Sequence, residues 1–142
     1  MPRSRLKVLF LVESLSGGGA EKVLSGLVRG LDRERFDVTV CTVVDCGPYR
    51  EEVGKYAHYR TIVGGRGWLY RLKYALVYRF LPAGWIYKWC IAGDYDVEAA
   101  FTEGFPTRLL AAAPEGKARR LAWVHVDLEA RPWTQGPVFR SL

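Results

Sequence analysis

Short apolar runs alternate with amphipathic segments along most of the chain. The runs at residues 6–12 and 36–44 are nearly continuous and rich in branched and aromatic side chains, which is typical of strands buried on both faces of a parallel sheet. Between them, apolar residues recur at helical spacing from Ala20 to Leu31, with charged residues in the intervening positions. This strand-helix-strand order predicts a right-handed βαβ crossover at the start of the chain.

The alternation continues toward the C-terminus. We expect a short helix at 49–56, a strand at 59–63, a helix at 68–80 with a turn or two more at 85–91, a strand at 97–102, a helix at 106–113 and a strand at 120–126. The whole pattern predicts an α/β fold, a Rossmann-like open parallel sheet with helices on both faces. Residues 1–142 are the length of one domain, so a second full domain does not fit.

Gly26 and Gly30 lie inside the first predicted helix. Each glycine should cost about 1 kcal/mol relative to alanine in a helix interior. We therefore expect the helix to pack closely on the sheet at these two positions, because such packing would offset the cost.

Composition and charge narrow the choice of compartment and partner. The net charge of +6 favours anionic partners such as phosphates, nucleic acid or an acidic membrane surface. Cys41, Cys46 and Cys90 form an odd set without CxxC spacing, which indicates neither a disulfide framework nor a zinc site. We expect no metal and a cytoplasmic location. The first apolar run is too short for a signal peptide, and no run reaches the length of a membrane-spanning helix.

A glycine-rich turn follows the first predicted strand. Gly17, Gly18 and Gly19 let the backbone approach a ligand closely, and the amides that open the next helix favour an anion. The alternative is a tight turn that only caps the helix. A dinucleotide fingerprint is not complete, because Lys22 occupies the place of its third glycine. Asp45 after the second strand keeps a dinucleotide-binding oxidoreductase open as a third interpretation of function.

Three segments together resemble family 4 glycosyltransferases. They are SGGGAEKVLSGLVRGL at residues 16–31, DYDVEAAFTEGFPTRLLAA at residues 94–112 and RRLAWVHVDLEAR at residues 119–131. The last two resemble members that build capsular and cell-surface polysaccharides. The order and spacing of the three segments make the resemblance far more specific than the glycines alone, and it covers nearly the whole chain.

The resemblance implies a retaining transferase of two nucleotide-fold domains, called the GT-B fold. This chain would be the N-terminal, acceptor-side domain, unfinished at its tail GPVFRSL (residues 136–142), and the donor-binding domain would be absent. The acceptor would be a glycan or a lipid-linked sugar. A nucleotide sugar would be the cosubstrate, with no other cofactor. We expect the chain alone to be inactive, as a fragment, a truncated product or a subunit that needs a donor-domain partner chain.

The same resemblance suggests the site residues. His125, at the end of the last predicted strand, corresponds to a family histidine close to the transferred sugar, and we expect it to be catalytic. Asp127 follows at the same edge and could orient an acceptor hydroxyl. Glu103 and Gly104 follow the fourth predicted strand, and we expect them to contact the acceptor. Without the resemblance, His125 is a structural histidine and the carboxylates are solvated loop residues.

A basic and aromatic stretch covers residues 55–89. No acidic residue lies between Glu52 and Asp94, whereas seven cations and ten aromatic residues do. One hypothesis is that this stretch docks on the anionic inner face of the membrane as a peripheral contact. The alternative is that the stripe formed by Leu69, Leu72, Leu76 and Phe80 simply covers the sheet of this domain. Nucleic acid is not expected, because no recognition motif accompanies the cations.

A second function hypothesis comes from a different class. The chain could be a catalytically inactive module that binds a glycan, a lipid or a partner transferase. Sugar identity, linkage and oligomeric state do not follow from the residues.

Overall fold

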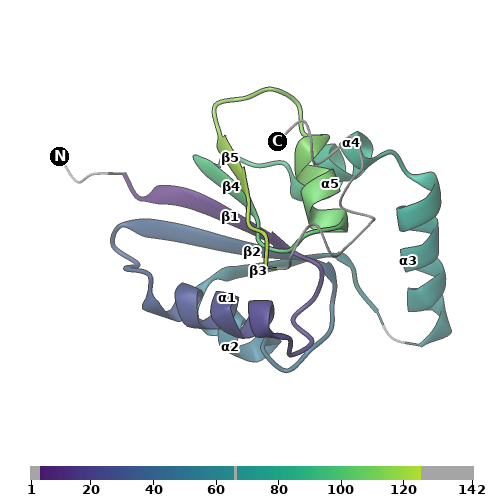
Figure 1. The fold of residues 1–142 in the computed structure, drawn as a ribbon, viewed down its shortest axis with the longest axis horizontal. Coiled ribbons are helices and arrows are strands. Elements are labelled where there is room, and N and C mark those ends of the chain that lie inside the picture. Colours follow the sequence, from purple (N-terminus) through teal and green to yellow (C-terminus); the bar gives the residue numbers. More distant parts are fainter. Residues whose placement is uncertain (1–3, 66, 126–142) are drawn as a thin grey trace.

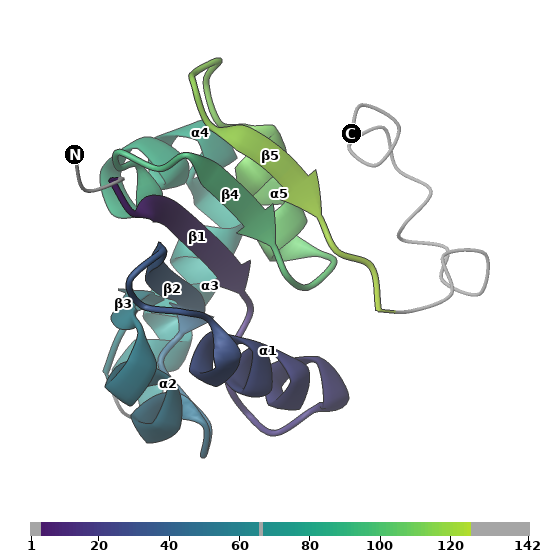
Figure 2. The same cartoon turned by 90° about the vertical axis from the view of Figure 1, so that its left-hand side faces the viewer.

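One open sheet organises the molecule, whose computed structural model describes residues 4–65 and 67–125. Its five strands are all parallel and lie in the order β3-β2-β1-β4-β5, side by side as Figure 2 shows. They are β1 (Leu6–Val12), β2 (Phe36–Val44), β3 (His58–Val63), β4 (Val97–Ala100) and β5 (Arg119–Ala122). The predicted α/β fold is therefore confirmed.

Helices cover both faces of the sheet (Figure 1). On one face lie α1 (Gly19–Gly30) and α2 (Arg50–Tyr56). On the other face lie α3 (Trp68–Phe80), α4 (Ala83–Ile86), the π-helical segment η1 (Tyr87–Ile91) and α5 (Phe105–Ala111). The predicted bounds of β1, β2 and α3 are confirmed. The fourth and fifth strands are shorter than predicted, since they end at Ala100 and Ala122.

The sheet separates two hydrophobic cores. Alternate side chains of β1 enter opposite clusters: Leu9 and Leu11 pack beneath α4, η1 and α5, whereas Val8 and Phe10 pack beneath α1 and α2. A strand alternates its side chains between the two faces of a sheet. This double burial is why the sequence of β1 is almost continuously apolar rather than alternating.

The expected close packing of Gly26 and Gly30 on the sheet is wrong. Both glycines are exposed, and a Cβ atom added to either would meet nothing within 4 Å outside the helix's own backbone. Helix α1 instead packs through Leu24, Ser25 and Val28. The two glycines lie on the solvent face, so no packing offsets their helix-propensity cost.

The strand order places a topological switch point between β1 and β4. From β1 the chain winds outward through β2 to β3, and it then returns to continue from β4 to β5 on the other side. In open α/β sheets, ligands bind outside the carboxyl ends of the strands at such a point. The residues that directly follow β1 and β4 are therefore the first place to look for a site. None of the helices in the described residues is long and apolar enough to cross a bilayer.

Candidate functional site

The switch point joins Glu13, which follows β1, to Thr102, which lies two residues beyond β4. The backbone N–H of Glu13 donates to Oγ1 of Thr102 over 3.2 Å. A second backbone bond, from the N–H of Phe101 to the carbonyl of Leu11 at 2.7 Å, extends the pairing of the two strands up to this point. The carboxylate of Glu13 is thus held at the edge where this fold gathers ligands.

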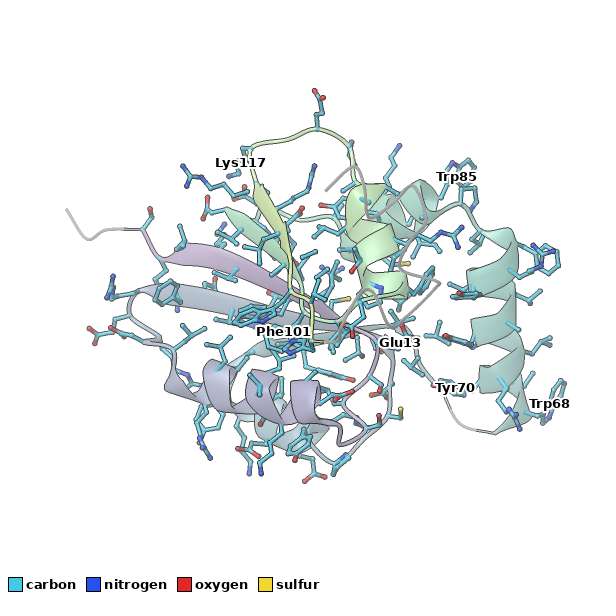
Figure 3. All side chains as sticks on the ribbon, in the orientation of Figure 1. Glu13, Trp68, Tyr70, Trp85, Phe101 and Lys117 are labelled. Atoms are coloured by element: carbon cyan, nitrogen blue, oxygen red, sulfur yellow. The ribbon has the colours of Figure 1, made fainter. Side chains whose placement is uncertain are left out.

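A cavity of about 410 Å³ opens beside Glu13. Its lining comes from the loop after β1, from the end of β2 and the loop that follows it, and from helix α3; it comprises Glu13, Ser14, Val44, Cys46, Tyr70, Arg71 and Tyr74. Figure 3 shows Glu13 at the end of the sheet and Tyr70 in the gap between the sheet and α3. The cavity combines a carboxylate, a guanidinium and two aromatic rings, a set of groups suited to a ligand with both hydroxyl and anionic parts.

The carboxyl group of Glu13 is electrostatically unusual. Burial raises its pKa, and a hydrogen bond that it accepts from the hydroxyl of Tyr74 at 2.8 Å offsets part of this rise. Burial, followed by the bond to Glu13, raises the pKa of Tyr74 as well, so its phenol keeps its proton. Among the ion pairs of the described residues, none includes Glu13. A half-buried carboxylate with a neutral partner keeps acceptor capacity for a ligand.

The glycine-rich turn forms the rim between β1 and α1. Gly17 has a φ of +112°, a conformation that L side chains rarely adopt, and Gly18 is the N-cap of α1. Gly19 opens the helix, and a Cβ atom there would meet nothing within 4 Å. The turn lies against the loop after β2, because the N–H of Leu15 donates to the carbonyl of Cys46 at 3.0 Å. The side chain of Glu21 lies beside Gly18 at the start of α1, and the contact of this turn with a ligand stays a prediction.

Glu103 and His125 come together at the neighbouring part of the same edge. The backbone N–H of His125 points to Oε2 of Glu103 at 3.5 Å, a long hydrogen bond. The ring of His125 packs on Phe101, with centroids 4.9 Å apart, and stacks on Trp123 at 5.8 Å. The predicted strand at 120–126 ends at Ala122, so His125 lies beyond the strand and not within it.

Gly104 and Asp127 are the other two residues that the sequence predicts for this edge. Gly104, with a φ of +92°, is the N-cap of α5 and turns the chain directly after Glu103. Asp127 lies outside the described residues. Glu103, Gly104 and His125 thus occupy one edge of the sheet together with Glu13.

Sequence reasoning missed Glu13, Tyr70, Arg71 and Tyr74 as site residues. Glu13 directly follows the first apolar run at residues 6–12, so its place at the carboxyl end of a predicted strand was visible in the sequence. Tyr74 is 61 residues away from it, and helical spacing alone does not tell which face of α3 turns toward the sheet. The position of Glu13 at the end of a predicted strand was therefore enough to identify it as a site residue. The positions of Tyr70, Arg71 and Tyr74 in the sequence were not enough.

A comparison with protein families assigns most of the chain to a family. The family described as Glycosyltransferase Family 4 matches residues 17–141. This span begins inside the glycine-rich turn and includes Tyr74, Glu103 and His125. No curated protein and no solved structure matches the chain.

Proposed function

The chain belongs to glycosyltransferase family 4, and from this premise we propose that it is the acceptor-binding half of a retaining sugar transferase. In this proposal a nucleotide sugar is held by a donor-binding domain outside these 142 residues, and no metal or further cofactor takes part. The acceptor is a glycan or a lipid-linked sugar of the kind used in capsular or cell-surface polysaccharide synthesis. The reaction forms a bond between an acceptor hydroxyl oxygen and the anomeric carbon. The bond from the anomeric carbon to the nucleotide breaks, the nucleotide leaves with the bonding electrons, and its leaving phosphate oxygen takes up the hydroxyl proton.

The observation that carries the proposal is the cavity beside Glu13 at the switch point. A carboxylate accepts hydrogen bonds from sugar hydroxyls, and a bond to a charged acceptor is stronger than one to a neutral acceptor. The rings of Tyr70 and Tyr74 offer apolar surface to the C–H face of a sugar. Arg71 supplies a cation for a phosphate of a lipid-linked acceptor.

The remaining candidate residues receive supporting roles in this proposal. Glu103 contacts the acceptor, while His125 lies near the transferred sugar as a hydrogen-bond partner. The turn at Gly17, Gly18 and Gly19 lets the ligand approach the start of α1, and Gly104 shapes the neighbouring loop. Asp127, in the segment that follows His125, keeps the role of orienting an acceptor hydroxyl.

Transfer assays test the proposal. The chain is incubated with a uridine-diphosphate sugar and a polyprenyl-pyrophosphoryl sugar acceptor, with and without a polypeptide that carries the donor-binding half of a family member. We expect transfer only when that polypeptide is added. Acceptor binding without transfer in either case would instead favour the inactive binding module. A chain that shows no acceptor binding and no transfer would contradict both functions.

Cys46 provides a readout of acceptor binding that does not depend on turnover. It lines the cavity and is exposed, whereas Cys41 is buried with a pKa raised to about 11 and Cys90 is half-buried with a raised pKa, in both cases because of burial. Cys46 should therefore react first with iodoacetamide, since the thiolate is the reacting form. An acceptor in the cavity is expected to slow this reaction.

Glu13→Gln is expected to weaken acceptor binding by about tenfold to a hundredfold, the usual range for loss of a hydrogen bond to a charged group. Protection of Cys46 from alkylation, measured as a function of acceptor concentration, gives the affinity. Glu51→Gln is the matched control, because it removes the same charge from α2 on the opposite face of the sheet. Equal affinities of the Glu13 variant and the parent chain would remove Glu13 from the site.

The same substitution is expected to stabilise the fold at neutral pH. Because burial raises the pKa of Glu13 in the folded state, the folded chain binds this proton more tightly than the unfolded chain. The free energy of unfolding therefore falls as the pH rises from the ordinary value of 4.5 through the folded pKa, and it stays lower above it. Glu13→Gln should unfold at a higher urea concentration than the parent chain at pH 7. The difference should vanish below about pH 4, and a difference independent of pH would contradict this account.

A further inference from the structure

The apolar stripe of helix α3 faces solvent. Leu69, Leu72, Leu76 and Phe80 are between 46% and 72% exposed, and no residue of α3 is fully buried. The side turned toward the protein carries Tyr70, Tyr74 and Val77, which pack partly against the core. The expectation that the leucine stripe covers the sheet is therefore wrong.

Three tryptophans extend this surface. Trp68 begins α3, while Trp85 in α4 and Trp89 in η1 follow its end, and the three are 65% to 75% exposed. Figure 3 shows Trp68 and Trp85 directed outward near the two ends of α3. We call these three residues, together with the leucine stripe and Phe80, the α3 outer face.

The α3 outer face has exposed cations beside it, and these cations have no carboxylate partners among the described residues. Arg71, Lys73, Arg79 and Lys88 are exposed, and none of them forms an ion pair with another described residue. Lys88 lies over the ring of Trp89, 5.9 Å from its centroid. The absence of acidic residues between Glu52 and Asp94 leaves this surface positively charged.

Several cations and tyrosines of the 55–89 stretch do not belong to this surface. Lys55 lies in α2 on the opposite face of the sheet, and Arg60 donates to the carbonyls of Cys90 and Ile91 at 2.9 and 3.3 Å. Tyr70 and Tyr74 turn inward to the cavity, and Tyr87 is buried. The basic and aromatic surface is therefore formed by residues 68–89 and not by the whole stretch 55–89.

We propose that the α3 outer face docks on an anionic lipid bilayer surface. Exposed tryptophan, leucine and phenylalanine side chains insert at the boundary between headgroups and acyl chains, and flanking cations attract anionic headgroups. A second copy of the chain fits this surface poorly, because self-association would bring like charges together without a compensating carboxylate. Arg71 and Tyr70 belong to α3 and to the cavity wall alike, so docking would also bring the cavity close to the bilayer.

Vesicle sedimentation with the 142-residue chain tests this inference independently of acceptor chemistry. We expect binding to vesicles of phosphatidylglycerol and phosphatidylcholine, and weaker binding to phosphatidylcholine alone or at high ionic strength. The Lys73→Gln, Arg79→Gln and Lys88→Gln triple variant should lose about a hundredfold in partitioning, at about fivefold for each cation. The matched control, Lys22→Gln with Arg29→Gln and Arg35→Gln, removes the same charge from exposed positions outside this face and should bind like the parent chain.

A second variant separates insertion from simple charge attraction. Leu72→Ser with Leu76→Ser changes two exposed side chains, so the fold should be unaffected, and binding to anionic vesicles should fall while the charge is unchanged. Three results would overturn the inference: no vesicle binding, equal losses in both triple variants, or a dimer in sedimentation velocity that the two serine substitutions dissociate. The vesicles contain no sugar acceptor, so failure here leaves the proposed transferase function untouched.

Discussion

Arg120→Leu is expected to lower the free energy of unfolding by about 3–5 kcal/mol, because it leaves the charge of a buried carboxylate unpaired. Glu98 in the interior strand β4 is only 2% exposed. It accepts a hydrogen bond from Nε of Arg120, its partner in β5, at 2.8 Å, and a second one from the hydroxyl of Tyr87. Burial, followed by this bond to Glu98, raises the pKa of Tyr87 to about 12.

Urea unfolding of a small set of variants measures this effect. Glu98→Met combined with Arg120→Leu removes both charges, so the double variant should be more stable than Arg120→Leu alone. Arg29→Leu is the control, since it breaks the exposed pair of Arg29 with Glu52, whose atoms lie 3.3 Å apart, and should cost at most about 1 kcal/mol. A loss of similar size for Arg120→Leu and Arg29→Leu would show that burial of Glu98 is not decisive.

Gly47→Ala is expected to cost about 3 kcal/mol and to disturb the cavity. Gly47 has a φ of +114°, and a Cβ atom there would overlap the backbone of Leu15 and Ser16. Strain of this kind costs about 1–3 kcal/mol, and the backbone overlap adds to it because no flexible side chain can move aside. The loops after β1 and β2 would have to separate at the hydrogen bond between Leu15 and Cys46.

Two measurements check the Gly47 prediction. Urea unfolding gives the loss of stability, and alkylation of Cys46 in the folded chain should become less sensitive to acceptor. Gly26→Ala is the matched control: Gly26 is an exposed helical position with open space around it, and alanine there should stabilise the chain by about 0.5–1 kcal/mol. Destabilisation by both substitutions would show that the positive φ and the overlap at Gly47 do not explain its effect.

The candidate site divides into a part that sequence reasoning reached and a part that it missed. Gly17 and Glu103 follow predicted strands, at the carboxyl ends where ligands gather, whereas His125 was selected through the resemblance to family 4 glycosyltransferases. Glu13 satisfied the same rule but was passed over. Arg71 and Tyr74 lie within a helix, and their contribution to a cavity depends on the face by which α3 meets the body of the protein.

The sequence by itself determined the strand and helix order, the parallel α/β sheet and the family. Those properties depend on periodicities between near neighbours in the chain, which residues such as Leu9, Leu11 and Leu24 display directly. Only the tertiary structure decided that Tyr74 meets Glu13, that Arg60 anchors η1, and that the leucine stripe of α3 is exposed. Each of these depends on contacts between distant segments. An amphipathic pattern indicates that the two faces of a helix differ, but it does not indicate which face the protein buries.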